Sequence, residues 1–178
     1  MKAPVIFDSK ELCEVVAGDD KNLQNRIVRK SLLELGIGGA SQIAMFTTLN
    51  FRINEVKGND AHTKLIGHEI TASFIKTFAR RGKSLIHQVV EDKTKDNEKL
   101  CLKLIAVTGA RVSQNTKRNL RKILVDDSRK AITDGNLEDV MQDVLYGRLA
   151  SKLFNRLKQI TKMRRVEVRK SQLTEIFK

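Results

Sequence analysis

The first part of the chain alternates apolar and polar side chains in stretches that are separated by turn-forming residues. Residues 26–35 and 41–56 are rich in Ile, Val, Leu, Thr and Phe, and a glycine-rich segment at 36–39 lies between them. This alternation predicts two antiparallel strands. The sequence Lys-Gly-Asn-Asp at 57–60 is typical of a turn, because Gly and Asn accept positive φ, and it predicts a returning third strand over 61–66.

A short helix and a second hairpin are predicted next. From Glu69 to Arg81 apolar residues recur at helical spacing, with two arginines in the last turn and Gly82 as a C-terminal stop. Residues 84–91 and 99–108 again show β-branched, partly alternating character on either side of a polar loop. These two segments predict a second β-hairpin.

In the last third of the chain the hydrophobic period changes from strand-like to helical. Apolar residues fall on one side of 115–132, follow the i, i+3, i+4, i+7 rule from Leu137 to Leu145, and recur in 148–160. An alternating stretch at 165–170 then predicts one more strand.

Strands that come first and helices that come later predict an α+β fold. We expect antiparallel hairpins curled into a small barrel-like sheet, with one short helix between the hairpins and further helices towards the C-terminus. The length of 178 residues suits a single domain, and no Pro-rich or repetitive linker divides it. Within that domain, residues 1–108 are expected to be mainly β, and residues 109–178 mainly helical with a short final strand.

The chain carries a large positive charge, most of it towards the C-terminus. Lys and Arg number 34 against 21 Asp and Glu, which gives a net charge of +13. Residues 1–108 hold 17 basic and 13 acidic side chains, whereas residues 109–178 hold 17 and 8. Such a surplus in a folded protein points to a polyanion. Nucleic acid is favoured over a membrane, because no segment approaches the roughly 20 apolar residues of a spanning helix. Without a secretory signal at the start, we expect a cytoplasmic protein.

Two stripes of cations on predicted helices are the clearest candidate contacts. Lys117, Arg118, Arg121 and Lys122 fall at i, i+1, i+4 and i+5 and form one contiguous strip, with Arg111 in the preceding loop. An isolated strip of this kind usually only faces water, but the basic surplus of the region favours contact with a phosphate backbone.

The second stripe runs at i, i+4, i+8 and is interrupted by few acidic residues. It consists of Arg148, Lys152 and Arg156 and is followed by Lys162, Arg164 and Arg165. The helix between the two stripes is acidic on its polar side, which we interpret as a solubility face, with a lid or a protein contact as the alternatives.

No pattern points to catalysis, a metal or a cofactor. His62, His68 and His87 have no metal-ligand spacing, the glycine-rich segment lacks the Lys-Ser/Thr of a nucleotide-binding loop, and the carboxylates are scattered. Cys13 and Cys101 form no CxxC pair and are expected to be buried free thiols.

Aromatic residues are few, which limits the kind of nucleic-acid contact that is expected. The chain has seven Phe, one Tyr and no Trp, and most Phe occupy apolar-periodic positions of a core, such as Phe74, Phe78 and Phe154. Base stacking on exposed rings is therefore not the expected mode. Contacts to the phosphates and 2′-hydroxyls of folded RNA fit better.

Five blocks of the sequence, in order, resemble one protein family. They are GNDAHTKLIGHEIT (58–71), FIKTFARRGKSLI (74–86), TGARVSQNTKRNLRKIL (108–124), YGRLASKLF (146–154) and RRVEVRKSQL (164–173). The segment APVIFDSKEL (3–12) also resembles the start of that family. On these blocks the chain is similar to the S3Ae (eS1) family of archaeal and eukaryotic small-subunit ribosomal proteins, with the compact length of archaeal members.

The resemblance implies a structural protein of the small ribosomal subunit, without catalysis, metal or cofactor. It implies a position on the platform near the messenger exit and the 3′ end of the small-subunit RNA. Its expected partners are ribosomal RNA, neighbouring ribosomal proteins and messenger RNA near the exit. The basic residues of the matching blocks become candidate RNA contacts: Arg80, Arg81, Lys83, Lys117, Arg118, Arg121, Lys122, Arg169 and Lys170. The alternative is a free RNA-binding regulator of translation, and a metal-dependent nuclease is a third class that the scattered carboxylates disfavour.

Overall fold

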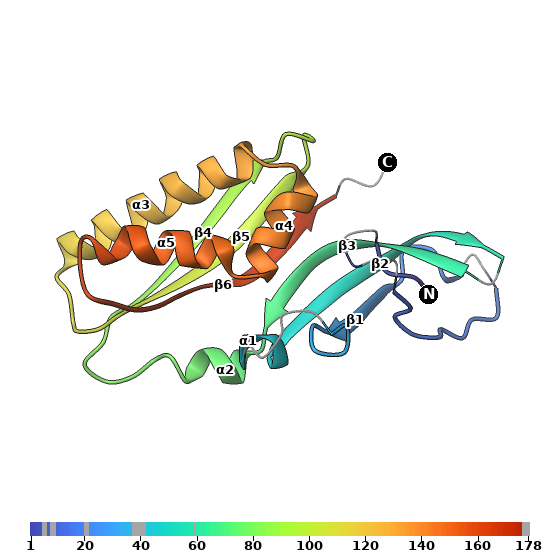
Figure 1. Cartoon of the computed structure of the whole chain (residues 1–178), viewed down its shortest axis with the longest axis horizontal. Helices are drawn as coiled ribbons and strands as arrows, with labels where there is room; N and C mark the ends of the chain where they lie inside the picture. The colour runs from blue at the N-terminus through green and yellow to red at the C-terminus, as the bar shows by residue number, and fades with distance from the viewer. Residues whose placement is uncertain (5–6, 8–9, 20–21, 37–41, 59, 176–178) are drawn as a thin grey trace. The chain divides into compact units, whose positions relative to one another are not determined.

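Helices and antiparallel strands make up the computed structural model of the chain, which describes residues 1–4, 7, 10–19, 22–36, 42–58 and 60–175 (Figure 1). The predicted α+β class is confirmed. The chain divides into two compact units, Met1–Thr71 and Ala72–Lys178. This division comes earlier in the chain than the change from strands to helices.

The first unit is a three-stranded antiparallel meander. Its strands are β1 (Ile27–Ser31), β2 (Thr47–Lys57) and β3 (Asp60–Ile70), and β2 pairs with both neighbours. Alternate residues over the first part of β2, from Thr47 to Ile53, are buried, among them Phe51, against which Phe7 packs edge-on with the ring centroids 5.7 Å apart. The predicted order of three strands is therefore confirmed.

The strand boundaries in this unit differ from the predicted ones. β1 ends at Ser31 because the following apolar residues, Leu32 and Leu35, are buried in a turn rather than in a strand. The predicted strand over 41–56 begins instead with a single helical turn, α1 (Gln42–Met45). Burial of small apolar clusters in turns thus produced a pattern that resembles strand alternation.

The second unit combines a three-stranded antiparallel sheet with four helices. β5 (Lys99–Thr108) lies between β4 (Leu85–Lys93) and β6 (Met163–Thr174). Its helices are α2 (Ala72–Lys76), α3 (Gln114–Thr133), α4 (Leu137–Leu145) and α5 (Arg148–Lys158). Neither unit closes into a barrel among the described strands, because no ladder joins β1 to β3 or β4 to β6.

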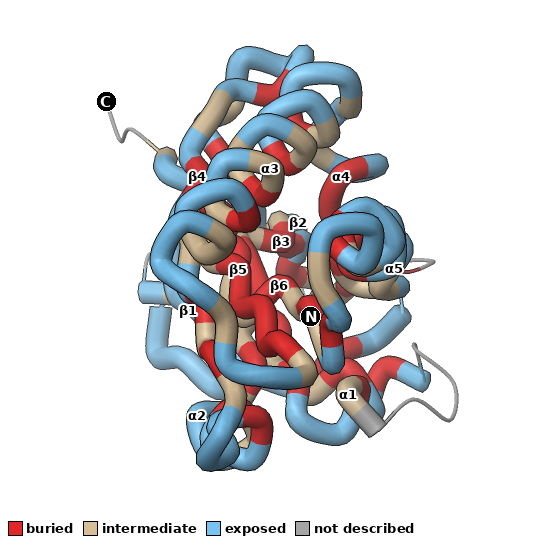
Figure 2. The backbone as a smooth tube through the Cα atoms, turned by 90° about the vertical axis from the view of Figure 1, so that its left-hand side faces the viewer, coloured by how far each residue is buried: buried red, intermediate tan, exposed pale blue. Residues whose placement is uncertain are grey.

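The core of the second unit lies between one face of its sheet and the helices α3 and α5 (Figure 1). The tube of β5 is buried along almost its whole length in Figure 2. Every leucine that α3 and α5 turn towards this core is at most 3% exposed: Leu120, Leu124, Leu149, Leu153 and Leu157. Burying such a side chain stabilises the fold by roughly 1.5–3 kcal/mol, so this packing fixes both helices on the sheet.

The predicted helix from Glu69 to Arg81 is much shorter in the structure. Glu69 and Ile70 belong to β3 and pair with β2, so that α2 begins only at Ala72. Strand pairing outweighs helical periodicity here, because tertiary contacts override a weak local preference. The second hairpin and the three later helices are confirmed, and each helix end lies within two residues of its predicted position.

For three residues the structure differs from the predicted burial. Ile160, expected in the core, follows the end of α5 and is 42% exposed, and Phe154 is only half-buried. Cys101 is buried as expected, but Cys13 is half-buried, so the prediction of a buried thiol is wrong there. In the described part of the chain, no helix combines the length and apolar character that a bilayer span requires.

Candidate nucleic-acid interface

Three segments that are far apart in sequence meet at one end of the sheet of the second unit. β5 ends there, and β4 and β6 begin there, because Leu85 lies opposite Val107 and Thr108 lies opposite Met163. The short connections 109–113 and 159–162 place the first turn of α3 and the last turn of α5 near the same end of the sheet (Figure 1).

The segments that reach this end of the sheet contain basic residues and no acidic ones. Residues 72–90 hold four Lys or Arg, residues 109–125 hold five and residues 144–166 hold seven, without a single Asp or Glu. We call the cations nearest to this end of the sheet the basic end: Arg80, Arg81, Lys83, Arg111, Lys117, Arg118, Arg121, Lys122, Lys158, Lys162 and Arg164. Folding therefore concentrates charge that is dispersed along the chain.

Buried hydrogen bonds fix the loops of the basic end. The Ser84 N–H donates to Thr108 Oγ1 and the Thr108 N–H donates to the Ser84 carbonyl, both at 3.0 Å. The Val112 N–H donates to Ser84 Oγ at 3.2 Å, which ties the loop before α3 to the start of β4. Ser84 and Thr108 are 4% and 0% exposed. Lys83 and Arg111, each next to a residue of this network, therefore start from fixed backbone positions.

Gly109 allows a close approach between two connections of the basic end. Its N–H donates to the carbonyl of Lys162 at 2.7 Å. A Cβ atom at position 109 would lie 3.0 Å from Lys162 Cγ, so that a larger residue would push this side chain or its strand away. The absence of a side chain thus keeps Lys162 against the loop that leads into α3.

The predicted stripe on α3 is exposed to half-exposed in the structure. Ser113 caps the helix by accepting a hydrogen bond from the Thr116 N–H at 3.2 Å. Among the described residues, no carboxylate lies within 4.0 Å of the four cations of the α3 stripe, which are Lys117, Arg118, Arg121 and Lys122. The positive end of the helix dipole adds to their field.

The second predicted stripe lies in a different electrostatic setting. Asp143 of α4 is 3.6 Å from Arg148 and 3.2 Å from Lys152, and Asp127 of α3 is 3.9 Å from Arg156. Few acidic residues interrupt this α5 stripe along the chain, as expected, but in the folded protein neighbouring helices place carboxylates beside its three cations. At Asp143, the acidic side of α4 does more than keep the protein soluble.

Arg165 is engaged within the protein. Its guanidinium lies 4.5 Å from the ring centroid of Phe78 and 5.2 Å from that of Phe74, and its Nε is 3.1 Å from Glu167 Oε1. Burial raises the pKa of Glu167, and the hydrogen bond from Arg165 partly opposes that shift. These contacts hold the Arg165 side chain against the rings of Phe74 and Phe78.

The remaining candidates on β6 lie away from the basic end. Lys170 is opposite Lys103 in the middle of the sheet, and Arg169 falls at the register shift beside it, between the pairs of Val168 and Lys170. Both are half-buried. The structure therefore brings together the candidates of the α2–β4 loop, α3 and the start of β6, but not these two.

A family comparison agrees with this basic, α+β chain. The model of the ribosomal S3Ae family matches residues 1–176. The chain belongs to the ribosomal S3Ae family.

Curated relatives of this S3Ae chain come from archaea and are named small ribosomal subunit protein eS1. The protein of Methanobrevibacter smithii is 32% identical over 173 residues, which cover 97% of this chain and 88% of the relative. The protein of Methanothermobacter thermautotrophicus is 28% identical over 98% of this chain and 88% of its own length. For Haloarcula marismortui the identity is 30%, over 97% and 80%. The predicted archaeal-type membership is confirmed.

Sequence reasoning missed one cation of the basic end in this S3Ae chain. Lys158 occupies the last turn of α5, next to the connection that carries Lys162. The signal was present, because the run without acidic residues from 144 to 166 includes it. Within the described ranges, no group of three or more His, Cys, Asp or Glu residues is placed to hold a metal ion.

Proposed function

We propose that this chain is a structural constituent of the small ribosomal subunit that binds folded ribosomal RNA through the basic end of its second unit. Contact is made to phosphates and 2′-hydroxyls rather than by base stacking. The position on the subunit is the platform near the messenger exit and the 3′ end of the small-subunit RNA. Neighbouring ribosomal proteins, and messenger RNA near the exit, complete the surroundings in the cytoplasmic ribosome.

The observation that carries the proposal is the convergence of segments without acidic residues at one end of the sheet, where β5 ends and β4 and β6 begin. The basic end holds eleven cations, and the α3 stripe has no carboxylate within 4.0 Å among the described residues. Family membership and the names of the archaeal relatives support the ribosomal assignment. The family resemblance supports the position on the platform.

Charge reversal of the α3 stripe tests the RNA contact. The variant K117E/R118E/R121E/K122E should bind small-subunit ribosomal RNA far more weakly. Its plot of log affinity against log salt should be shallower by about three to four, since each lost phosphate contact removes close to one unit of slope. Filter binding between 50 and 300 mM salt measures both quantities, and circular dichroism checks that the helices persist.

A matched control separates a specific site from overall charge. The variant K93E/K95E/K99E/K130E carries the same change of net charge, on exposed residues of the β4–β5 hairpin and the last turn of α3. It should retain most of the affinity. Equal losses in both variants would contradict a localised interface. A protein that sediments only in light fractions, and never with small subunits at high salt, would favour a free regulator of translation.

A further inference from the structure

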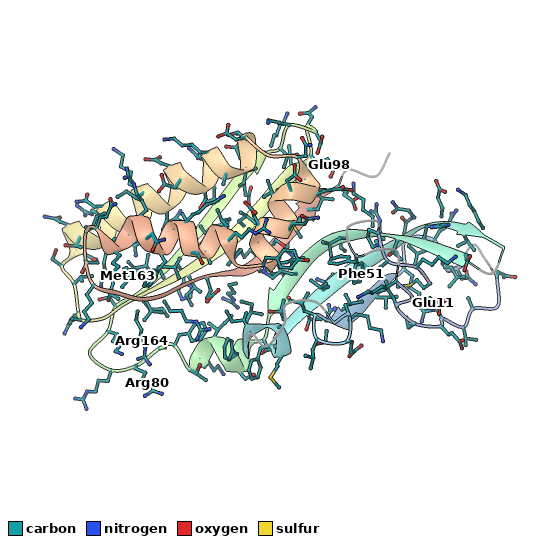
Figure 3. All side chains as sticks on the ribbon, viewed as in Figure 1. Glu11, Phe51, Arg80, Glu98, Met163 and Arg164 are labelled. Atoms are coloured by element: carbon teal, nitrogen blue, oxygen red, sulfur yellow. The ribbon has the colours of Figure 1, made fainter. Side chains whose placement is uncertain are left out.

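Arg80, Lys83 and Arg164 lie on two segments of the basic end, the loop before β4 and the start of β6. Arg80 and Lys83 are joined by a turn in which the Lys83 N–H donates to the Arg80 carbonyl at 3.3 Å and Gly82 has a φ of +80°. Figure 3 shows Arg80 and Arg164 at the same end of the second unit, beside Met163. Loss of hydration lowers the pKa of Lys83, and the positive charges of Arg164 and Arg80 lower it further. The charges of Arg80 and Arg164 therefore both act on the ammonium group of Lys83.

Contacts next to these residues hold them in this arrangement. Arg165, which follows Arg164, stacks on Phe74 of α2 and on Phe78, and Phe78 lies two residues before Arg80. On the other side, Ser84 follows Lys83 and is hydrogen-bonded to Thr108, which lies opposite Met163 across the sheet. Ser84 and Met163 are thus two strand spacings apart, about 10 Å, a gap that side chains as long as Lys and Arg can close.

No internal anion balances this group. Neither Arg80, Lys83 nor Arg164 has a carboxylate within 4.0 Å in the described part of the chain, although Arg165 next to them does. Like charges held together without a counter-charge repel one another and disfavour the charged state of Lys83. An anion placed between them would remove that cost. Two guanidinium groups and an ammonium group suit the oxygens of a phosphate.

We propose that Arg80, Lys83 and Arg164 form one seat for a single phosphate of the RNA backbone, positioned by the stack of Arg165 on Phe74 and Phe78. This inference rests on the proposed function and deepens it. It separates one shared phosphate contact from the independent contacts along α3. The seat recognises a phosphodiester and not a base, because all three side chains are donors only.

A double-mutant cycle tests whether the residues share one phosphate. R80Q and R164Q should each weaken binding of transcribed small-subunit ribosomal RNA by about tenfold. The double variant R80Q/R164Q should lose well below the product of the single losses, because the first substitution already disrupts the shared contact. In contrast, R80Q combined with R118Q of α3 should lose close to the full product, since these two residues contact different phosphates.

Arg81 supplies the matched single-site control. It is exposed and adjacent to Arg80, and it lies outside the proposed seat. R81Q should therefore weaken binding less than R80Q, and its combination with R164Q should be multiplicative. Thermal unfolding of every variant confirms that the fold is unchanged.

The outcomes separate the two proposals. Wild-type protein that fails to bind the RNA would overturn the proposed function and the seat with it. Wild-type binding together with independent, multiplicative effects of R80Q and R164Q would overturn the seat alone. Coupling between R80Q and R164Q, and none between R80Q and R118Q, supports it.

Discussion

The α3 and α5 stripes look alike in sequence and differ in the folded molecule. Both place cations at helical spacing on the outer side of a helix whose inner side carries buried leucines. The α3 stripe meets no carboxylate among the described residues, whereas Asp143 and Asp127 reach all three cations of the α5 stripe. Spacing along one helix thus predicts that a stripe exists. Neighbouring helices decide whether its charge is available to a partner.

The difference is one of degree, because exposed ion pairs are weak. The cations of the α5 stripe that pair with Asp143 are 65% and 71% exposed in their side chains. Such pairs stabilise a protein by about 0–1 kcal/mol and are screened by salt. RNA can therefore compete for the α5 stripe, but at the expense of these pairs. The α3 stripe requires no such exchange.

The largest expected effect concerns the inner sides of α3 and α5, where both helices carry buried leucines. Leu124→Ala in α3 and Leu153→Ala in α5 should each lower the free energy of unfolding by about 2–5 kcal/mol, since both side chains are at most 2% exposed and their loss leaves a cavity. Urea unfolding measures this. Leu33→Ala, at a position that is 52% exposed, is the control and should change little. A loss confined to one helix would show that the two do not share one core.

The next largest effect tests the cation stripes on the outer sides of α3 and α5. Neutralising two cations of α3 in R118Q/K122Q should reduce the salt dependence of RNA binding by about two units of slope. R148Q/K152Q in α5 should reduce it by less than one, because these cations are already partly neutralised by Asp143. Filter binding of both variants over the same salt series gives the comparison. Equal slopes would show that the ion pairs of α5 do not limit its contact with RNA.

The same contrast explains which parts of the structure the sequence could predict. The hydrophobic period of α3, α4 and α5 is set by burial against one sheet face, so it was visible in the sequence and placed each helix within two residues. Short segments were less predictable. Glu69 and Ile70 follow a helical period but pair with β2, and Leu32 and Leu35 are buried in a turn.

The candidate site was predictable as composition but not as geometry. Runs of basic residues at 80–83, 117–122 and 162–165 are visible in the chain. Their meeting at one end of the sheet depends on the antiparallel order of β4, β5 and β6, which local patterns do not specify. The stack of Arg165 on Phe74 and Phe78 and the pairing of Arg148 with Asp143 are tertiary contacts of the same kind.

A smaller effect is expected at the start of each helix. Ser113 caps α3 through its side chain, whereas α5 begins after Gly147 without a side-chain cap. Ser113→Ala should lower the free energy of unfolding by about 1 kcal/mol. It should also weaken RNA binding slightly, because fraying of the first turn loosens Lys117 and Arg118. Urea unfolding and filter binding measure the two changes, and Ser151→Ala, exposed within α5, is the control that should alter neither.

The smallest expected effect would make the two stripes more alike. Asp143→Asn removes the carboxylate that holds Arg148 and Lys152, at a stability cost of under about 1 kcal/mol because the pairs are exposed. The freed cations should raise RNA affinity a few-fold and steepen the salt dependence, and R148Q/K152Q in the same background should now cost more than in the wild type. Asp139→Asn, on the same helix and exposed, changes the net charge equally and is the control. If both substitutions raise the affinity alike, the gain comes from overall charge and the ion pairs do not distinguish α5 from α3.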